Sequence, residues 1–201
     1  QSCLPLLQTQ AAIDALCLAW HSTRLELLET AILQAHYLPT NPLSLRLKVG
    51  IKTGRKDLLL GLSPYAVTDY LESITDSDPI IRARAMEQAS DLSPEARDEI
   101  CRLAIYSGSN EALSVVLQHD LRPTTLTDQA LLLFLQERWA DYALLDFDRR
   151  ILETAYTAAP EGLRKRIAAR NRSAGKPEFL SILSDGDRRL HSGAFSPEEA
   201  D

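Results

Sequence analysis

The sequence has little glycine and few aromatic residues, and it lacks the patterns typical of sheets and membrane spans. Of its 201 residues 8 are glycine, and aromatic residues make up 6%. No long Val/Ile/Thr alternation predicts a strand, and no run reaches the roughly 18 apolar residues that cross a bilayer. No basic-then-apolar signal sequence is present. These absences favour an all-α protein with no membrane partner.

Cysteine is too sparse to support a disulfide framework. Cys3, Cys17 and Cys101 are odd in number, widely spaced and without a Cys-x-x-Cys motif. Reduced thiols and a cytoplasmic location are the simpler interpretation. Because Cys17 and Cys101 fall on or beside apolar stripes, we expect them to be buried structural thiols.

The patterns of most catalytic and metal centres are also missing. The four histidines, His21, His36, His119 and His191, include no pair at i, i+4 spacing, and there is no His-Glu-x-x-His, Gly-x-Ser-x-Gly or glycine-rich phosphate loop. The sequence therefore predicts no catalytic residue, no cofactor and no metal site. His36 and His119 lie just before prolines, where contact with helix C-terminal carbonyls explains them.

The best-defined pattern present is a helix over residues 78–92. Ile81, Ala85, Ala89 and Leu92 lie at steps of four, four and three, which is one buried helical stripe. Asp78 is placed to cap the helix, and the following proline suits its first turn. A second helix begins at once with Ser93 as cap and Pro94 as opener, so the two predict an antiparallel pair.

Apolar stripes predict helices along most of the remaining chain, and an internal repeat connects them. A shift of 84 positions aligns Asp14 with Asp98, Cys17 with Cys101, and Pro39-Thr40 with Pro123-Thr124. A shorter spacing of 37 relates the prolines of Asn41-Pro42 and Asp78-Pro79. The predicted stretches are 3–20, 25–35, 43–51, 57–63, 67–74, 112–117, 126–139, 146–159, 163–171 and 179–183.

These features resemble the HEAT-like family of helical repeats. Asp78, Pro79, Arg82 and Ala85 match its Asp-Pro-x-x-Arg-x-x-Ala pattern, and Leu92 supplies the closing leucine. The resemblance implies a HEAT-like α-solenoid of four to five antiparallel helix pairs over residues 1–184. It also implies that Asp78 and Arg82 link neighbouring repeats through hydrogen bonds.

The ends of the chain suggest a segment of a longer protein. The sequence starts with glutamine, and residues 185–201 are expected to form a polar linker followed by the cut start of another helix. Leu131–Trp139 and Leu144–Asp148 are similar to helical segments of large multidomain bacterial proteins. In those proteins such segments adjoin propellers or nucleotide-switch modules.

Two basic groups suggest a surface for an anionic partner. Lys48, Lys52 and Lys56 are spaced by four, which places them on one helical stripe. The alternative is a solvated face balanced by acids, which the net charge of −6 favours. The candidate surface residues are Lys48, Lys52, Arg55 and Lys56 in one group, and Arg164, Lys165, Arg166 and Arg170 in the other.

A group of acids near aromatics is the remaining candidate for chemistry. Asp141, Asp146 and Asp148 lie close in sequence to Trp139 and Phe147. Such acids serve glycosidases, but acids where a helix begins more simply cap it and complement its dipole. Capping is the favoured interpretation.

The sequence thus predicts a non-enzymatic scaffold or regulatory segment that binds a protein partner or neighbouring domains of the same polypeptide. One alternative is a nucleic-acid-binding module with a basic face like that of HEAT-like DNA glycosylases. The other is a HEAT-like enzyme, either a glycosylase or a pigment-attaching lyase, with an acid such as Asp141 or Asp146 beside an aromatic in a deep pocket.

Overall fold

The computed structural model describes residues 7–175, 177–179 and 181–183. All regular elements in these residues are helical, with twelve α-helices and four shorter helical turns and no strand. The all-α prediction is confirmed. Within the same residues, none of the helices combines the length and the apolar character that crossing a bilayer requires. The predicted linker and truncated helix at 185–201 lie outside the described residues.

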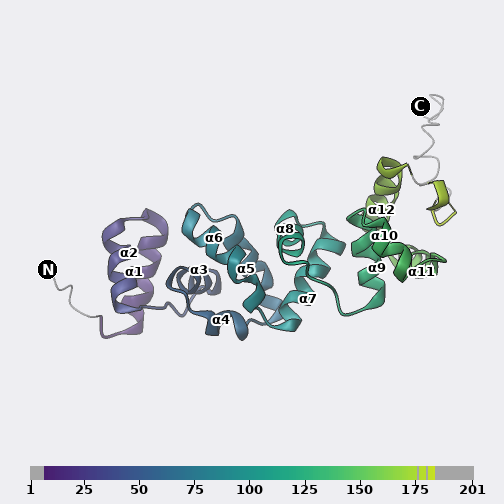
Figure 1. Cartoon of the computed structure of the whole chain (residues 1–201). Helices are drawn as coiled ribbons and strands as arrows, with labels where there is room; N and C mark the ends of the chain where they lie inside the picture. Colours follow the sequence, from purple (N-terminus) through teal and green to yellow (C-terminus); the bar gives the residue numbers. More distant parts are fainter. Residues whose placement is uncertain (1–6, 176, 180, 184–201) are drawn as a thin grey trace, which may run out of the picture. The chain divides into compact units, whose positions relative to one another are not determined.

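The chain forms two compact units, Gln1–Glu99 and Ile100–Asp201, whose helices are labelled in Figure 1. Unit 1 contains α1 (Gln10–Thr23), α2 (Glu26–Ala35), α3 (Leu43–Thr53), α4 (Lys56–Leu60), η1 (Pro64–Ala66), α5 (Val67–Ile74), α6 (Pro79–Glu87) and η2 (Gln88–Asp91). Helix α7 (Pro94–Arg102) begins in unit 1. Unit 2 continues with η3 (Leu103–Ser107), α8 (Asn110–His119), α9 (Leu126–Leu135), α10 (Trp139–Leu145), α11 (Arg150–Ala158), α12 (Glu161–Ala174) and η4 (Pro177–Phe179).

The helix predicted from residue 78 is present. The Asp78 side chain accepts a hydrogen bond from the Ile80 amide at 2.8 Å, and Pro79 is the first residue of α6. All four stripe residues are buried, although the last turn tightens into η2. Ser93 caps α7 by accepting from the Ala96 amide at 3.1 Å. The local sequence signals therefore fixed both helix starts.

The 84-residue register is confirmed by the helix bounds. Shifted by 84, α2 becomes 110–119, which is α8, and α1 becomes 94–107, which is α7 followed by η3. After the same shift of 84, the starts of α3 to α6 fall within two residues of the starts of α9 to α12. Residues with a left-handed backbone conformation also correspond after this shift, since Arg24 matches Gly108 and His36 matches Asp120. The twelve α-helices of the described residues are therefore two copies of one six-helix set.

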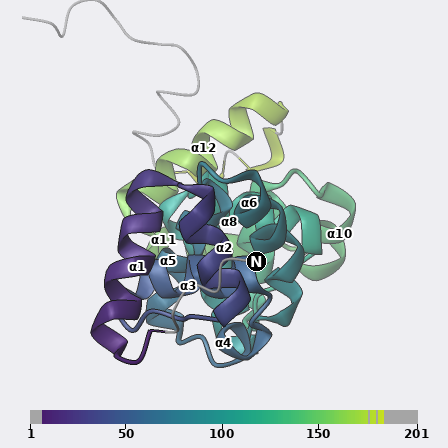
Figure 2. The same cartoon turned by 90° about the vertical axis from the view of Figure 1, so that its left-hand side faces the viewer.

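Unit 1 is built around contacts among α3, α5 and α6, with α1 packed beside α2 (Figures 1 and 2). Its largest buried side chains include Trp20, Tyr70 and Ile81. The sequence predicts an apolar stripe on the first helix through Ala11, Ala15, Leu18 and Ala19, and this stripe is wrong: all four are exposed, Leu18 by 52%, and the buried residues of α1 are Cys17 and Trp20. The sequence alone did not reveal which face of α1 meets α2 and α3.

Unit 2 is organised around α9, which contacts α10, α11, α12 and η3. Phe134 is fully buried at the centre of an aromatic cluster with Trp139, Tyr142 and Phe179. The predicted continuous helix over 126–139 is wrong: α9 ends at Leu135, because Glu137 takes a left-handed conformation (φ 60°), and α10 follows as a separate helix.

The two described cysteines are buried, as predicted, and this gives a first testable consequence. Cys17 and Cys101 are both 0% exposed, and burial, with a smaller contribution from Asp14, raises the pKa of Cys17 to about 11. In a Cys3→Ser variant at pH 8, Ellman's reagent is expected to label less than one thiol per native molecule, because the thiolate is the reactive form. Unfolding in urea should expose both thiols within minutes. Rapid labelling of the native variant would contradict the burial.

Candidate functional site

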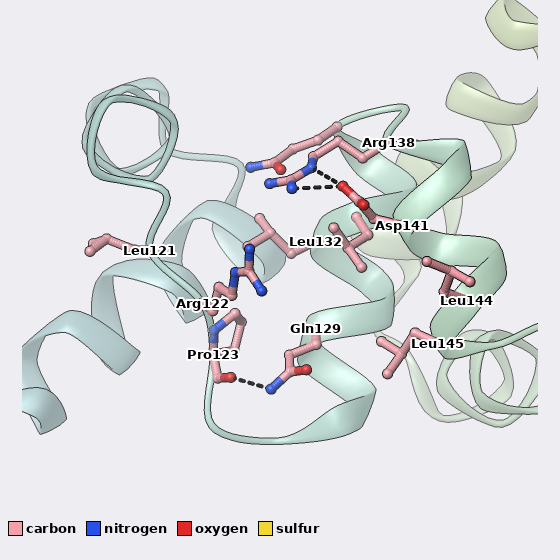
Figure 3. A pocket seen from close by; sticks show the side chains of 11 residues that line it. Leu121, Arg122, Pro123, Gln129, Leu132, Arg138, Asp141, Leu144 and Leu145 are labelled. Carbon is pink, nitrogen blue, oxygen red and sulfur yellow. Dashed lines mark hydrogen bonds and ion pairs between the residues drawn. The ribbon is translucent and has the colours of Figure 1, made fainter.

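A pocket of about 290 Å³ in unit 2, here called the leucine pocket, is the first candidate site (Figure 3). One wall is formed by Gln129, Leu132 and Leu133 on one face of α9, with Gln136, the residue that caps its C-terminal end. The opposite wall is a face of α10, and the loop after α8 closes one side. The other lining residues are Leu121, Arg122, Pro123, Arg138, Asp141, Leu144 and Leu145.

The charges around the leucine pocket are paired with one another. Arg138 contacts Asp141 at 2.7 Å and Asp120 at 2.7 Å, and Arg122 contacts Asp120 at 3.1 Å. Hydrogen bonds from Arg138 and then Arg122 lower the pKa of the Asp120 carboxyl. The two arginines and two aspartates therefore balance, and the pocket carries little net charge.

The apolar part of the pocket is open to solvent on one side. Leu132 is buried at 4% exposure, whereas Leu144 is 87% exposed. Gln129 donates to the Pro123 carbonyl at 2.8 Å, which holds the loop against α9 (Figure 3). An apolar pocket with an exposed leucine at its margin fits an apolar side chain presented by another molecule. Its lining supplies guanidinium, carboxamide and one carboxylate.

The three candidate acids are not brought together in this pocket. Asp141 lines it, but no aromatic residue does. Asp146 is buried and accepts from the Ile151 and Leu152 amides at 3.0 and 2.9 Å and from the Tyr142 hydroxyl at 2.7 Å. Asp148 accepts from the Arg150 amide at 3.3 Å. Capping is confirmed for both, although the helix they cap, α11, begins at Arg150 rather than at Asp146.

Asp78 and Arg82, the predicted repeat-linking residues, both serve the start of α6. Besides capping the helix, Asp78 accepts from the Lys52 ammonium on α3. Arg82 donates to the carbonyls of Asp76 and Ser77 at 2.5 and 3.0 Å. Asp78 therefore connects two helices within unit 1, and Arg82 fixes the loop between α5 and α6. A role between repeats stays a prediction.

A buried polar network that sequence reasoning missed centres on Asp76. Its side chain is 2% exposed and accepts from the Asp78 amide at 2.9 Å, from Arg24 at 3.0 Å and from Lys48 at 3.3 Å. Burial opposes ionisation, but the Asp78 amide, Arg24 and Lys48 together hold the pKa of this carboxyl below its usual value. The sequence feature that could have indicated this network is the pair of acids Asp76 and Asp78 just before Pro79.

The first basic group does not form the exposed stripe that the sequence suggested. Lys52 is buried and lies 2.7 Å from Glu29, and the Lys48 side chain is only 12% exposed. Lys56 pairs with Asp91 at 2.9 Å, and Arg55 pairs with Asp57 at 2.8 Å. An exposed lysine face is therefore wrong for Lys48 and Lys52, because α5 and α6 pack against that side of α3. Whether the group binds anything stays a prediction.

The second basic group is divided between ion pairs and a pocket. Lys165 pairs with Glu161 at 2.6 Å, and Arg170 pairs with Glu137 at 2.7 Å. Arg166 and Arg170 line a second pocket, next to α12. The Arg164 side chain instead keeps its Nε buried and without a hydrogen-bond partner. The structure thus brings two of the four bases to one site.

His36 and His119 lie at the C-terminal ends of helices, as the sequence predicted. His36 is the C-terminal cap of α2, and His119 is the last residue of α8. Burial, then Arg24 and Lys48, lower the pKa of His21. In the described residues no three His, Cys, Asp or Glu side chains gather as metal ligands would. His191 lies outside the described residues.

Comparisons of the chain with protein-family models, with curated protein sequences and with solved structures give no match. The resemblance to HEAT-like repeats therefore stays a prediction from the sequence motif. The leucine pocket and the pocket beside α12 have to be interpreted from their own geometry and chemistry.

Proposed function

We propose that this chain is a non-enzymatic protein-binding segment, and that the leucine pocket holds an apolar side chain of the partner. The observation that carries the proposal is the combination of a preformed apolar pocket with Leu144, which is 87% exposed at its margin. Exposed large apolar residues around a pocket are typical of interaction sites. Phe147, in the loop after α10, is also 84% exposed.

The chemistry of the pocket supports a partner segment with an apolar anchor flanked by polar groups. Leucines from α9 and α10 would surround the anchor, and the paired charges of Arg138 and Asp141 would form a polar rim. Because these charges are already balanced, shape and apolar burial would supply most of the affinity. Electrostatics would contribute mainly to orientation.

We also propose that the helices form a HEAT-like solenoid. Support comes from the duplicated set of six helices and from the Asp78–Lys52 contact between α6 and α3. In such an array each repeat contacts mainly its neighbours, so an extended surface is available for a partner. A cytoplasmic location belongs to the same proposal.

Nucleic acid is the less favoured partner. Six of the eight candidate bases lie within 4.0 Å of a carboxylate: Lys48, Lys52, Arg55, Lys56, Lys165 and Arg170. Binding a phosphate backbone there would require breaking pairs that are already formed. No comparable cost applies to an apolar anchor in the leucine pocket.

A peptide selection on the purified full chain tests the proposal. Peptides selected from a phage-displayed library are expected to share an apolar anchor and to bind wild type in fluorescence polarisation. Leu144→Glu should weaken binding at least tenfold, because it places an unpaired carboxylate beside leucines. Leu27→Glu is the matched control, since Leu27 is 64% exposed on α2 in the other unit. It should bind within twofold of wild type.

Two results would count against the proposal. One is a selection that enriches no peptide, and the other is peptides that bind the Leu144→Glu variant as well as wild type. Salt-sensitive binding of single- or double-stranded DNA, with no peptide enrichment, would favour the nucleic-acid alternative instead. Circular dichroism of both variants checks that the helices are retained.

A further inference from the structure

A second pocket of unit 2, here called the arginine pocket, shares Leu132 with the leucine pocket and has otherwise different lining residues. Its volume is about 430 Å³, which is in the range of small-molecule sites. The lining is mostly apolar, and the charged residues in it are Arg166 and Arg170, both from α12. The other lining residues are Ala104, Gly108, Asn110, Leu113, Leu132, Leu135, Ala169 and Ser173.

Arg166 is the unusual member of this pocket because no acid among the described residues pairs with its charge. Its Nη1 donates to the Ala104 carbonyl at 3.3 Å, and its Nη2 is buried without a hydrogen-bond partner. No carboxylate of the described residues lies within 4.0 Å of it, and burial alone lowers its pKa. Buried guanidinium groups are normally paired. Arg170, in contrast, is already paired with Glu137.

The duplication shows what the corresponding place contains in the other six helices. With the shift of 84 residues, Ala104 corresponds to Trp20, and Leu132 corresponds to Lys48. Trp20 is 1% exposed and has the Arg24 guanidinium 4.9 Å from its ring centroid. Where unit 1 has a buried indole, unit 2 has only the methyl group of Ala104, which lines the arginine pocket and leaves more space at this position.

The same register explains why Arg166 is left without strong partners. Its counterpart is Arg82, which donates to two carbonyls in the loop before α6. In unit 2 the loop before α12 is shorter than the loop before α6, because α11 ends at Ala158 and α12 already begins at Glu161. The Pro160 carbonyl in this loop accepts from the Leu163 and Arg164 amides. The Pro160 carbonyl of this loop thus accepts from amides of α12, and the Arg166 guanidinium donates to the Ala104 carbonyl instead.

The backbone is shaped to receive the guanidinium. Gly108 has φ +69°, and a Cβ there would lie 2.5 Å from Arg166 Nη1. The Ala104 carbonyl belongs to a π-helical turn over Leu103–Ser107, whereas the corresponding residues of α1 are α-helical. Single π-helical turns are rare and occur frequently at functional sites. Two independent backbone features therefore hold Arg166 in an apolar pocket.

We propose that the arginine pocket binds a small organic carboxylate with an apolar body, whose carboxylate pairs with Arg166. One unpaired positive charge matches one negative charge, and a planar carboxylate suits a guanidinium. The leucines and alanines would cover the apolar body. A phosphate dianion fits less well, since the pocket has one free guanidinium and a mostly apolar lining that disfavours a second charge. This site is separate from the leucine pocket, and the proposal stands without it.

The test uses the full chain with sodium hexanoate as the carboxylate, hexanamide as its neutral isostere, and inorganic phosphate. Hexanoate is expected to raise the melting temperature and to shift NMR signals of α12, whereas hexanamide and phosphate bind at least tenfold more weakly. Arg166→Gln should weaken hexanoate binding at least tenfold. Lys165→Gln, which changes the charge equally on the same helix outside the lining, should bind within twofold of wild type.

A second variant separates binding from folding. Ala104→Trp places in unit 2 the residue that unit 1 has at the corresponding position, so it should abolish hexanoate binding while Arg166 is retained. Without ligand, Arg166→Gln should be at least as stable as wild type, because it removes a half-buried charge that no carboxylate of the described residues pairs with. Equal binding of hexanoate and hexanamide, equal binding of phosphate, or full binding by either pocket variant would overturn the proposal.

Discussion

Replacing Asp76 with alanine is expected to lower the free energy of unfolding by about 3 kcal/mol, in the range for breaking one side of a buried ionic network. Three donors lose their shared acceptor: the Asp78 amide, Arg24 and Lys48. The Lys48 side chain is only 12% exposed, so water cannot fully replace the carboxylate. Urea unfolding followed by fluorescence measures the change, with Trp20 as a reporter in a Trp139→Phe background.

The matched control for Asp76→Ala is Asp57→Ala. Asp57 also pairs with a base, Arg55 at 2.8 Å, but its side chain is 61% exposed. An exposed pair contributes about 0–1 kcal/mol, so this variant should unfold close to wild type. If the two substitutions have equal effects, the network around Asp76 is not the stabilising feature that its burial indicates.

The Asp76 network also has a pH signature. The folded-state pKa values of Asp76 and Asp78 are both lowered, in each case against the opposing effect of burial. Their stabilisation is therefore fully present above the unfolded carboxyl pKa of about 3.9 and is lost as pH falls through the lowered folded values. Wild type should lose more stability than Asp76→Ala between about pH 5 and pH 2. Parallel curves would contradict this assignment.

Phe134→Ala is expected to have the largest effect in unit 2, at about 3–5 kcal/mol. Phe134 is fully buried, and its ring centroid lies 5.3, 5.8 and 5.1 Å from those of Trp139, Tyr142 and Phe179 in edge-on geometry. The substitution removes these contacts and leaves a cavity between α9 and α10. Fluorescence of Trp139 in a Trp20→Phe background reports the unfolding of this unit.

Phe147→Ala provides the control for Phe134→Ala, since Phe147 is 84% exposed in the loop after α10. It should change the free energy of unfolding by less than about 0.5 kcal/mol. Phe134→Leu should lie between the two, because leucine refills part of the volume. A loss for Phe134→Ala no larger than that for Phe147→Ala would show that the aromatic cluster does not stabilise unit 2.

Local signals in the sequence were sufficient for most helices. Asp78 with Pro79, and Ser93 with Pro94, marked two helix starts, because a capping side chain and a proline act through the adjacent backbone. The break between α9 and α10 was missed, since the left-handed residue there is Glu137 rather than a glycine. Nothing in the local pattern identifies a non-glycine residue that tertiary packing places at positive φ.

The sites were less predictable than the helices. Lys48 and Lys52 share a stripe that reads as solvated, yet they are covered by neighbouring helices and neutralised by acids distant in sequence, Asp76 and Asp78. The leucine pocket combines two helix faces and a loop, so no single stretch contains it. Periodicity gives the face on which a residue lies, but not what packs against that face.

By itself, then, the sequence determined the all-α class, the caps of individual helices and the 84-residue duplication, because each is encoded by spacing and by contacts near in the chain. Only the tertiary structure decided where, among the positions related by this duplication, a side chain fills the space between helices and where a pocket remains. Trp20 fills its place, whereas Ala104 leaves a pocket beside Arg166. The physical reason is that a cavity is lined by side chains from several helices, and a charge stays unpaired when none of those helices places an acid beside it. Neither can be read from one stretch of sequence.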